Sequence, residues 1–261
     1  MIKLLADNAQ TISALPVPIA IGTQTGELPR ENVVTIYLNN KLLATIMATP
    51  SHVKELVLGF LYSEHIINSA NEITDITINQ DKRRSQVWVQ SDLKNPVLQN
   101  RIRTSGCGQG FTFLCPSEME EMPPLNSTTE IRKDEILRLT QEMTLKAELY
   151  RLTGGIHAAA LCDTHHIISF SEDIGRHNTI DKVIGDCLIR KIPTEGKIIL
   201  TTGRISSEML LKALRAKTPI LCSRTSPTEL AVQLGDKLKI TISGYVRANR
   251  INVYTHPERI I

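Results

Sequence analysis

The C-terminal half of the chain alternates short apolar runs with helix-period segments, and this alternation limits its fold more than any other feature. Five runs are predicted strands, at residues 157–162, 167–170, 197–202, 219–223 and 239–246. Apolar residues recur three or four positions apart, as on the buried face of a helix, at 136–150, 180–188, 206–217 and 228–238. The first of these helices is expected to end at Gly154-Gly155. Such repeated units predict a largely parallel sheet covered by helices.

The first part of the chain is β-rich and contains one predicted helix. Residues 33–38 and 42–49 alternate in polarity on either side of Asn39-Asn40, which predicts a hairpin. Residues 73–78 and 86–90 predict a second hairpin around the polar turn 80–84. A helix is expected after Thr49-Pro50-Ser51, because one helical face collects Val53, Leu56, Val57, Phe60 and Leu61.

These two patterns predict an α/β protein with two domains. A smaller β-rich α+β domain is expected over residues 1–125, and an α/β domain over residues 126–261. The polar, proline-bearing segment 116–130 is the predicted linker between them.

Composition excludes several classes of function. The net charge is only +3 and the basic residues form no block, which argues against nonspecific nucleic-acid binding. No run approaches the ~18 apolar residues of a membrane span, and the N-terminus does not resemble a signal peptide. Five cysteines without regular spacing are typical of a cytoplasmic protein with reduced thiols.

Three loops are expected where strands end and helices begin, at residues 171–178, 201–208 and 223–229. The last two carry Arg204 and Arg224 together with hydroxyl residues such as Ser206 and Ser207. Free N–H groups at a helix start favour phosphate, and arginine binds phosphate bidentately. Serine and threonine are also the ordinary N-caps of helices, so an anion site and plain capping both remain open.

The segment 244–254 is a further candidate binding site. Arg247 and Arg250 flank a short turn between two strand-like runs, and Tyr245 and Tyr254 are candidates for stacking on a flat ring. The alternative is an exposed hairpin turn with surface arginines.

Cys107 lies in T-S-G-C-G-Q-G-F, between glycines at 106, 108 and 110. The glycines make packing in a core unfavourable and allow a partner to approach closely. Arg101 and Arg103 upstream would lower the pKa of the thiol, and the thiolate is the nucleophilic form. Cys107 is therefore either a reactive thiol on a glycine hinge or a free surface thiol in a turn.

The remaining cysteines and histidines favour structural roles. Core positions are predicted for Cys162, Cys187 and Cys222, and Cys115 carries little weight. The C-D-T-H-H stretch at 162–166 resembles a strand turn without a second ligand pair at zinc spacing, so no metal site is expected. His157 lacks the H-x-E and P-C-x-x-C pattern of zinc deaminases. Three roles remain open for His177: a general base, a contact to a bound anion, or a residue at a helix start whose side chain pairs with Asp173.

Six motifs in order resemble the FdhD/NarQ family, the formate dehydrogenase accessory sulfurtransferases, from about residue 30 to the C-terminus. They are T-S-G-C-G, T-G-G-I-H-A-A-A-L-C, E-D-I-G-R-H-N-T-I-D-K, T-T-G-R-I-S-S-E-M, S-R-T-S-P-T-E-L-A and G-Y-V-R-A-N-R-I-N-V-Y-T. No single motif would be specific, whereas the set is.

The resemblance implies a cytoplasmic sulfur carrier that acts as a homodimer. Members take sulfur from a cysteine desulfurase as a persulfide and pass it to the molybdenum bis(molybdopterin guanine dinucleotide) cofactor of formate dehydrogenase. The resemblance also implies a three-layer, cytidine-deaminase-like α/β fold for the C-terminal domain, without the deaminase zinc site.

Carried over by position, the resemblance assigns the persulfide to Cys107. It assigns cofactor binding to the turn Tyr245, Val246, Arg247, Ala248, Asn249 and Arg250. Many members read C-G-x-C-G at the loop, where this chain has Gly110, so a two-thiol relay is not expected. We further hypothesise that Arg204, Ser206, Ser207 and Arg224 hold the cofactor together with this turn.

Two other functions fit the same residues. The protein could be a chaperone that binds and delivers the cofactor with Cys107 idle. It could also be a thiol hydrolase with Cys107 as nucleophile and His177 as base, although no pattern in the sequence links these two residues.

Overall fold

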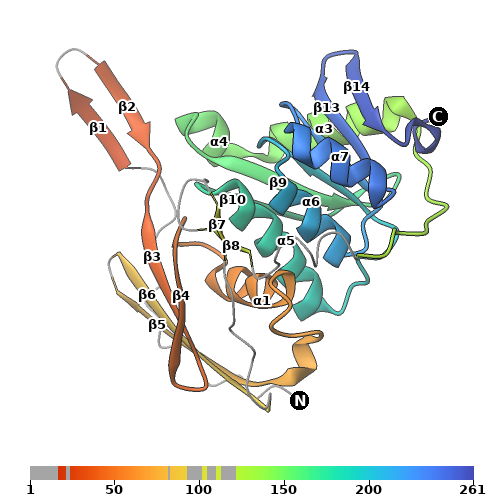
Figure 1. The fold of residues 1–261 in the computed structure, drawn as a ribbon. Coiled ribbons are helices and arrows are strands. Elements are labelled where there is room, and N and C mark those ends of the chain that lie inside the picture. Colours follow the sequence, from red (N-terminus) through yellow and green to blue (C-terminus); the bar gives the residue numbers. More distant parts are fainter. Residues whose placement is uncertain (1–16, 22–23, 82, 93–101, 105–109, 113–121) are drawn as a thin grey trace.

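The computed structural model describes residues 17–21, 24–81, 83–92, 102–104, 110–112 and 122–261. These residues form a four-stranded sheet, a six-stranded sheet and two two-stranded ribbons (Figure 1). The ribbons pair β1 (Val17–Ile21) with β2 (Gln24–Leu28) and β7 (Ile102–Thr104) with β8 (Gly110–Thr112). Within the described part of the chain, no helix has the length and apolar character needed to cross a membrane.

The N-terminal sheet has the strand order β4-β3-β6-β5 and confirms both predicted hairpins. Its strands are β3 (Asn32–Leu38), β4 (Lys41–Ala48), β5 (Ile73–Asp81) and β6 (Arg84–Ser91). Asn39 and Asn40 both have positive φ, as a two-residue hairpin turn requires. The buried face of this sheet, including Val34, Ile36 and Val87, packs on the predicted helix, α1 (Val53–Ser63). The short η1 (Ala70–Glu72) precedes β5.

The C-terminal sheet has the order β10-β9-β11-β12-β13-β14. Its strands are β9 (His157–Cys162), β10 (Ile167–Asp173), β11 (Ile198–Thr201), β12 (Ile220–Ser223), β13 (Thr241–Arg247) and β14 (Arg250–Thr255). The prediction of a largely parallel sheet is wrong, because only the pairs β11–β12 and β12–β13 are parallel. Tight turns join β9 to β10 and β13 to β14, and such turns give antiparallel pairs.

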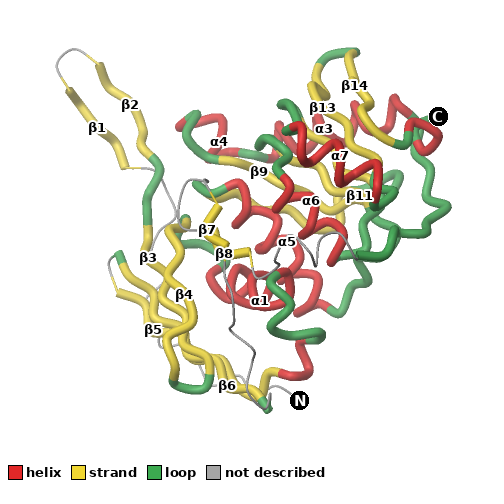
Figure 2. Tube along the Cα trace, in the orientation of Figure 1, coloured by secondary structure: helices red, strands yellow, loops and turns green. Residues whose placement is uncertain are grey.

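Helices cover both faces of this sheet and complete a three-layer α/β architecture (Figure 2). On one face lie α5 (Arg176–Arg190), α6 (Ser207–Arg215) and α7 (Glu229–Lys237), over Leu161, Ile199 and Leu221. On the other face, α3 (Lys133–Lys146) packs through apolar side chains against the sheet. The cytidine-deaminase-like arrangement in particular stays a prediction.

The helix predicted over 136–150 is instead two helices, α3 and the short α4 (Glu148–Thr153). Ala147 between them has ψ 81°, outside the helical range. The carboxylate of Glu172 accepts hydrogen bonds from the backbone N–H groups of Leu149 and Tyr150, at 3.2 and 2.7 Å. These bonds satisfy the start of α4, so the break reflects a contact with β10 that periodicity does not reveal.

Helix α1 packs on α5 with unusually close backbones. A Cβ atom added to Gly59 of α1 would overlap the carbonyl oxygen of Asp181, and one added to Gly185 of α5 would overlap that of Glu55. The two glycines therefore let the N-terminal sheet and its helix sit directly on the C-terminal layers. The domain boundary at 125/126 stays a prediction. The described part of the predicted linker, 122–130, contains no helix or strand, and Leu125 N–H donates to Leu238 O.

Candidate functional site

One edge of the C-terminal sheet collects the ends of β10, β11, β12 and β13, because β9 runs opposite to its two neighbours. The three loops predicted to lie together therefore do meet at this edge. Backbone hydrogen bonds tie the loop after β11 to the loop after β12, and the latter to β13. They are Arg224 N to Thr201 O at 3.1 Å, Ile205 N to Ser226 O at 3.2 Å, and Tyr245 N to Thr225 O at 3.0 Å. These hydrogen bonds fix the loop after β11, the loop after β12 and strand β13 relative to one another.

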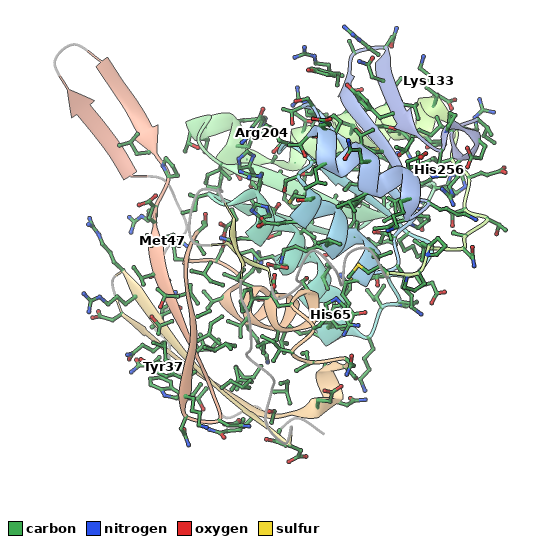
Figure 3. The ribbon with its side chains drawn as sticks, in the orientation of Figure 1. Tyr37, Met47, His65, Lys133, Arg204 and His256 are labelled. Carbon is green, nitrogen blue, oxygen red and sulfur yellow. The ribbon has the colours of Figure 1, made fainter. Side chains whose placement is uncertain are left out.

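The hydroxyls at the helix starts act as caps. Ser206 Oγ accepts from Met209 N–H at 3.5 Å, and Thr228 Oγ1 accepts from Ala231 N–H at 3.3 Å. The capping interpretation is therefore confirmed for α6 and α7. Arg204, labelled in Figure 3, is exposed in the loop before α6, and whether it contacts a ligand stays a prediction.

His177, at the start of α5, is paired with Glu208 and not with Asp173. Its Nε2 lies 2.8 Å from Glu208 Oε2 and 3.3 Å from Ser206 Oγ. Burial alone would raise the pKa of Glu208, but the hydrogen bond and charge of His177 hold it below its ordinary value. Asp173 instead pairs with the buried Lys182 at 2.6 Å. A structural partner for His177 therefore exists, and its role as a base is untested.

A cavity of about 560 Å³ lies between α3 and the β13–β14 hairpin. The hairpin contributes Val246, Arg247, Ala248 and Asn249, and the loop after β12 contributes Arg224. The opposite wall belongs to α3, and its polar members are Asp134, Arg138, Thr140, Gln141 and Thr144. Its size is within the ~300–1,000 Å³ typical of small-molecule sites. Four of the six predicted turn residues thus share one cavity with Arg224.

The cavity carries positive charge that carboxylates do not neutralise. The guanidinium of Arg224 donates to Thr144 Oγ1 at 3.2 Å and lies 6.0 Å from the Tyr150 ring centroid. Neither Arg224 nor Arg247 forms an ion pair among the described residues, whereas Arg138 pairs with Glu135 and Glu142 on the surface of α3. Two uncompensated guanidinium groups at one cavity suit a phosphate-bearing ligand.

Thr140 of the same wall carries a buried hydroxyl without a protein partner among the described residues. The residue is 5% exposed, and its Oγ1 has no partner within the described residues. A buried hydroxyl without a partner is costly, so a ligand group or water that reached it would be bound favourably. Sequence reasoning placed Thr140 on the buried face of the helix and missed this role. A hydroxyl residue in an otherwise apolar stripe was the available signal.

The turn places two cations near one aromatic ring. Arg247 and Arg250 lie 5.9 and 5.8 Å from the centroid of Tyr245. Tyr245 and Ala248 both have positive φ, and the strand register shifts between Gly244 and Arg247. The turn therefore has an irregular backbone, its exposed arginines lie within cation–π range of Tyr245, and whether it binds a ligand stays a prediction.

Cys107, its flanking glycines 106 and 108, and Cys115 lie outside the described residues, so their placement stays a prediction. The other three cysteines are buried, as predicted. Burial raises the pKa of Cys187 to about 11 and that of Cys222 to about 12, so both stay protonated thiols. Among the described residues, no three His, Cys, Asp or Glu side chains gather as a metal site would require.

Fold and site together define a three-layer α/β protein with a cation-lined cavity beside the β13–β14 turn. Residues 29–261 match the model of the FdhD/NarQ family, and the chain belongs to that family. Among its relatives are proteins named sulfur carrier protein FdhD. That of Bacillus subtilis is 40% identical over 233 residues, 87% of each chain. That of Bacillus pumilus is 37% identical over 239 residues, 91% of each chain.

The fold also has a solved counterpart. The crystal structure of a protein from Desulfotalea psychrophila, described as a candidate formate dehydrogenase accessory protein, aligns with a TM-score of 0.76 at 27% identity. The alignment covers 95% of this chain and all of the other. The two-sheet architecture is therefore one that this family adopts.

Proposed function

We propose that this protein is a sulfur carrier for formate dehydrogenase. It takes sulfur from a cysteine desulfurase as a Cys107 persulfide and transfers it to the molybdenum bis(molybdopterin guanine dinucleotide) cofactor, which is its cargo. Family membership and the names of the Bacillus relatives support this proposal. In this proposal the protein is a cytoplasmic homodimer, which binds first the cysteine desulfurase and then formate dehydrogenase.

The cavity beside the β13–β14 turn is the observation on which the proposal mainly rests. The cargo ends in two guanine nucleotides, which present phosphates and flat rings. Arg224 and Arg247 are the described cations without a carboxylate partner at this cavity, and they suit phosphate oxygens. Thr140 and Asn249 offer hydrogen bonds to the polar edges of such a ligand.

The proposed loading step is a thiol exchange. The Cys107 thiolate attacks the outer sulfur of the donor persulfide, a new S–S bond forms, and the donor cysteine leaves as a thiolate. Arginines 101 and 103 favour this step because they stabilise the attacking thiolate. No external oxidant or reductant takes part, because the sulfur passes between two thiolates.

The loading step is tested by intact-protein mass spectrometry after incubation with a cysteine desulfurase and L-cysteine. The wild type should gain a mass of about 32 Da per sulfur, and reductant should remove it. Cys107→Ala should gain nothing, while the matched Cys115→Ala variant should load as the wild type does. Equal loading of Cys107→Ala would mean that another thiol carries the sulfur.

A cofactor chaperone is the second candidate, because Arg224 and Arg247 at the cavity suit binding of the cargo and require no thiol chemistry. In that case the protein binds the guanine dinucleotide cofactor and delivers it unaltered. The two functions differ in cells that lack the wild-type gene. Formate dehydrogenase activity supported by Cys107→Ala favours the chaperone, and its loss, with cofactor binding intact, favours the sulfur carrier.

A further inference from the structure

Three helices meet at one buried lysine. Lys212 of α6 directs its Nζ at Asp181 of α5, 2.8 and 2.9 Å from the two carboxylate oxygens. It also donates to Oε1 of Glu64, directly after α1, at 3.2 Å. His65, labelled in Figure 3, follows Glu64 at this end of α1. We call Glu64, Asp181 and Lys212 the buried triad.

The triad has more carboxylates than cations. Glu64, Asp181 and Lys212 are only 9%, 2% and 5% exposed, so water screens their charges poorly. Glu208 lies one turn before Lys212 on α6 and adds a weaker negative charge near Glu64. His177 of α5 pairs with Glu208 at 2.8 Å. Arg215, the next cation on α6, is engaged with the backbone of Tyr62 and Ile67 and with Asn68. With both triad carboxylates ionised, one ammonium would face two negative charges.

The packing around the triad prevents a simple release of this charge. Helix α1 lies against α5 through Gly59, whose neighbour across the interface is the backbone of Asp181 itself. The helices therefore cannot separate locally to admit water without losing that contact. Protonation of one carboxylate removes the unfavourable buried charge at a smaller cost in free energy, as in other pairs of buried acids.

Geometry identifies the carboxyl that takes the proton. Asp181 receives Lys212 through both oxygens, whereas Glu64 has one longer contact. The ammonium therefore stabilises the charge of Asp181 more strongly. We propose that Glu64 is a proton-controlled joint, which holds α1 against α5 and α6 when protonated and weakens that contact when ionised.

The pKa of Glu64 agrees with this assignment. Burial raises it from 4.5 to about 7, and the attraction of Lys212 opposes the rise only in part. Between these two values the folded protein holds one proton more than the unfolded chain. Stability contributed by the joint is therefore present in full below pH 4.5, falls as the pH rises, and levels off above about pH 7.

The test compares unfolding by urea from pH 5 to pH 8 in the wild type and Glu64→Gln. Glutamine keeps the hydrogen bond to Lys212 but cannot ionise. The unfolding equilibrium constant of the wild type, relative to that of the variant, should rise roughly 50- to 100-fold across this range. Glu195→Gln, at a 70% exposed side chain, is the matched control and should follow the wild type. Parallel curves for the wild type and Glu64→Gln would overturn the proposal.

A direct titration decides the matter even if Glu64→Gln fails to fold. Carbon-13 spectra of the glutamate carboxyl groups in the wild type should show one group with a midpoint near pH 7. Asp181→Asn should lower that midpoint by at least about one unit, because Glu64 then has Lys212 to itself. If no glutamate carboxyl titrates above about pH 5.5, the joint does not exist. Neither experiment depends on the proposed sulfur chemistry.

Discussion

At the scale of single residues, the cavity beside the β13–β14 turn depends on charges that lack protein partners. Arg224 donates to Thr144, and Arg247 lies within cation–π range of Tyr245, so both guanidinium groups keep donors for a ligand. The sequence alone indicated both arginines as candidate ligand contacts, Arg224 in the loop after β12 and Arg247 in the β13–β14 turn. The Thr144 contact and the buried, unpaired hydroxyl of Thr140 became visible only when α3 was placed against the hairpin.

We expect Arg224→Ala and Arg247→Ala each to weaken binding of GDP, used as the probe, by roughly 10- to 150-fold. A hydrogen bond to a charged group contributes about 1.5–3 kcal/mol. Calorimetry at fixed ionic strength measures the change. Lys217→Ala removes an equal charge from the exposed pair with Glu195, away from the cavity lining, and should leave the affinity nearly unchanged. An equal loss in all three variants would mean that only net charge matters.

A second residue-scale prediction concerns the buried pair of Lys182 and Asp173. Lys182 Nζ also donates to Thr49 O at 3.2 Å, and Asp173 accepts from Thr49 N–H at 3.0 Å. Lys182→Met leaves Asp173 charged and buried, so we expect the free energy of unfolding to fall by about 3–5 kcal/mol. Chemical denaturation measures this. The double variant Lys182→Met with Asp173→Asn should recover part of the loss, and no recovery would contradict the charge argument.

At the scale of elements, the α1–α5 contact depends on two glycines. Because a Cβ at Gly59 or Gly185 would overlap backbone of the opposite helix, α1 would have to move away from α5. We expect Gly59→Ala and Gly185→Ala each to lower the free energy of unfolding by at least about 1–3 kcal/mol, despite the better helix propensity of alanine. Thermal unfolding measures the effect. Glu142→Ala on the outer face of α3 is the control, and equal stability of all variants would refute the close approach.

The sequence was most informative at this scale. Periodicity located α1, α5, α6 and α7, because one buried face repeats every three or four residues within a single helix. It failed at Ala147, where the carboxylate of Glu172 on a neighbouring strand starts a new helix. It also failed for strand direction. Strand–helix alternation was taken to mean parallel pairs, but β9 lies between two strands that run opposite to it.

At the scale of the whole molecule, the two sheets meet through α1, and the contacts there are ionic as well as apolar. The buried triad joins residues 64, 181 and 212, and the pair of Lys182 and Asp173 holds Thr49 beside it. We expect the proton-controlled joint to make the attachment of the N-terminal sheet the pH-dependent part of the protein. The cavity belongs to the opposite side of the sheet, next to α3, and does not include these groups.

Local patterns alone determined most of the helices, the two N-terminal hairpins, the buried cysteines and the motifs of the family. Each of these depends on residues a few positions apart, whose spacing survives any arrangement of the elements. The tertiary structure alone decided the strand directions, the α3 wall of the cavity, and the partners of His177 and Glu64. Those partners are 31 and 148 positions away in sequence, so only the packing of α5 and α6 against α1 brings them together.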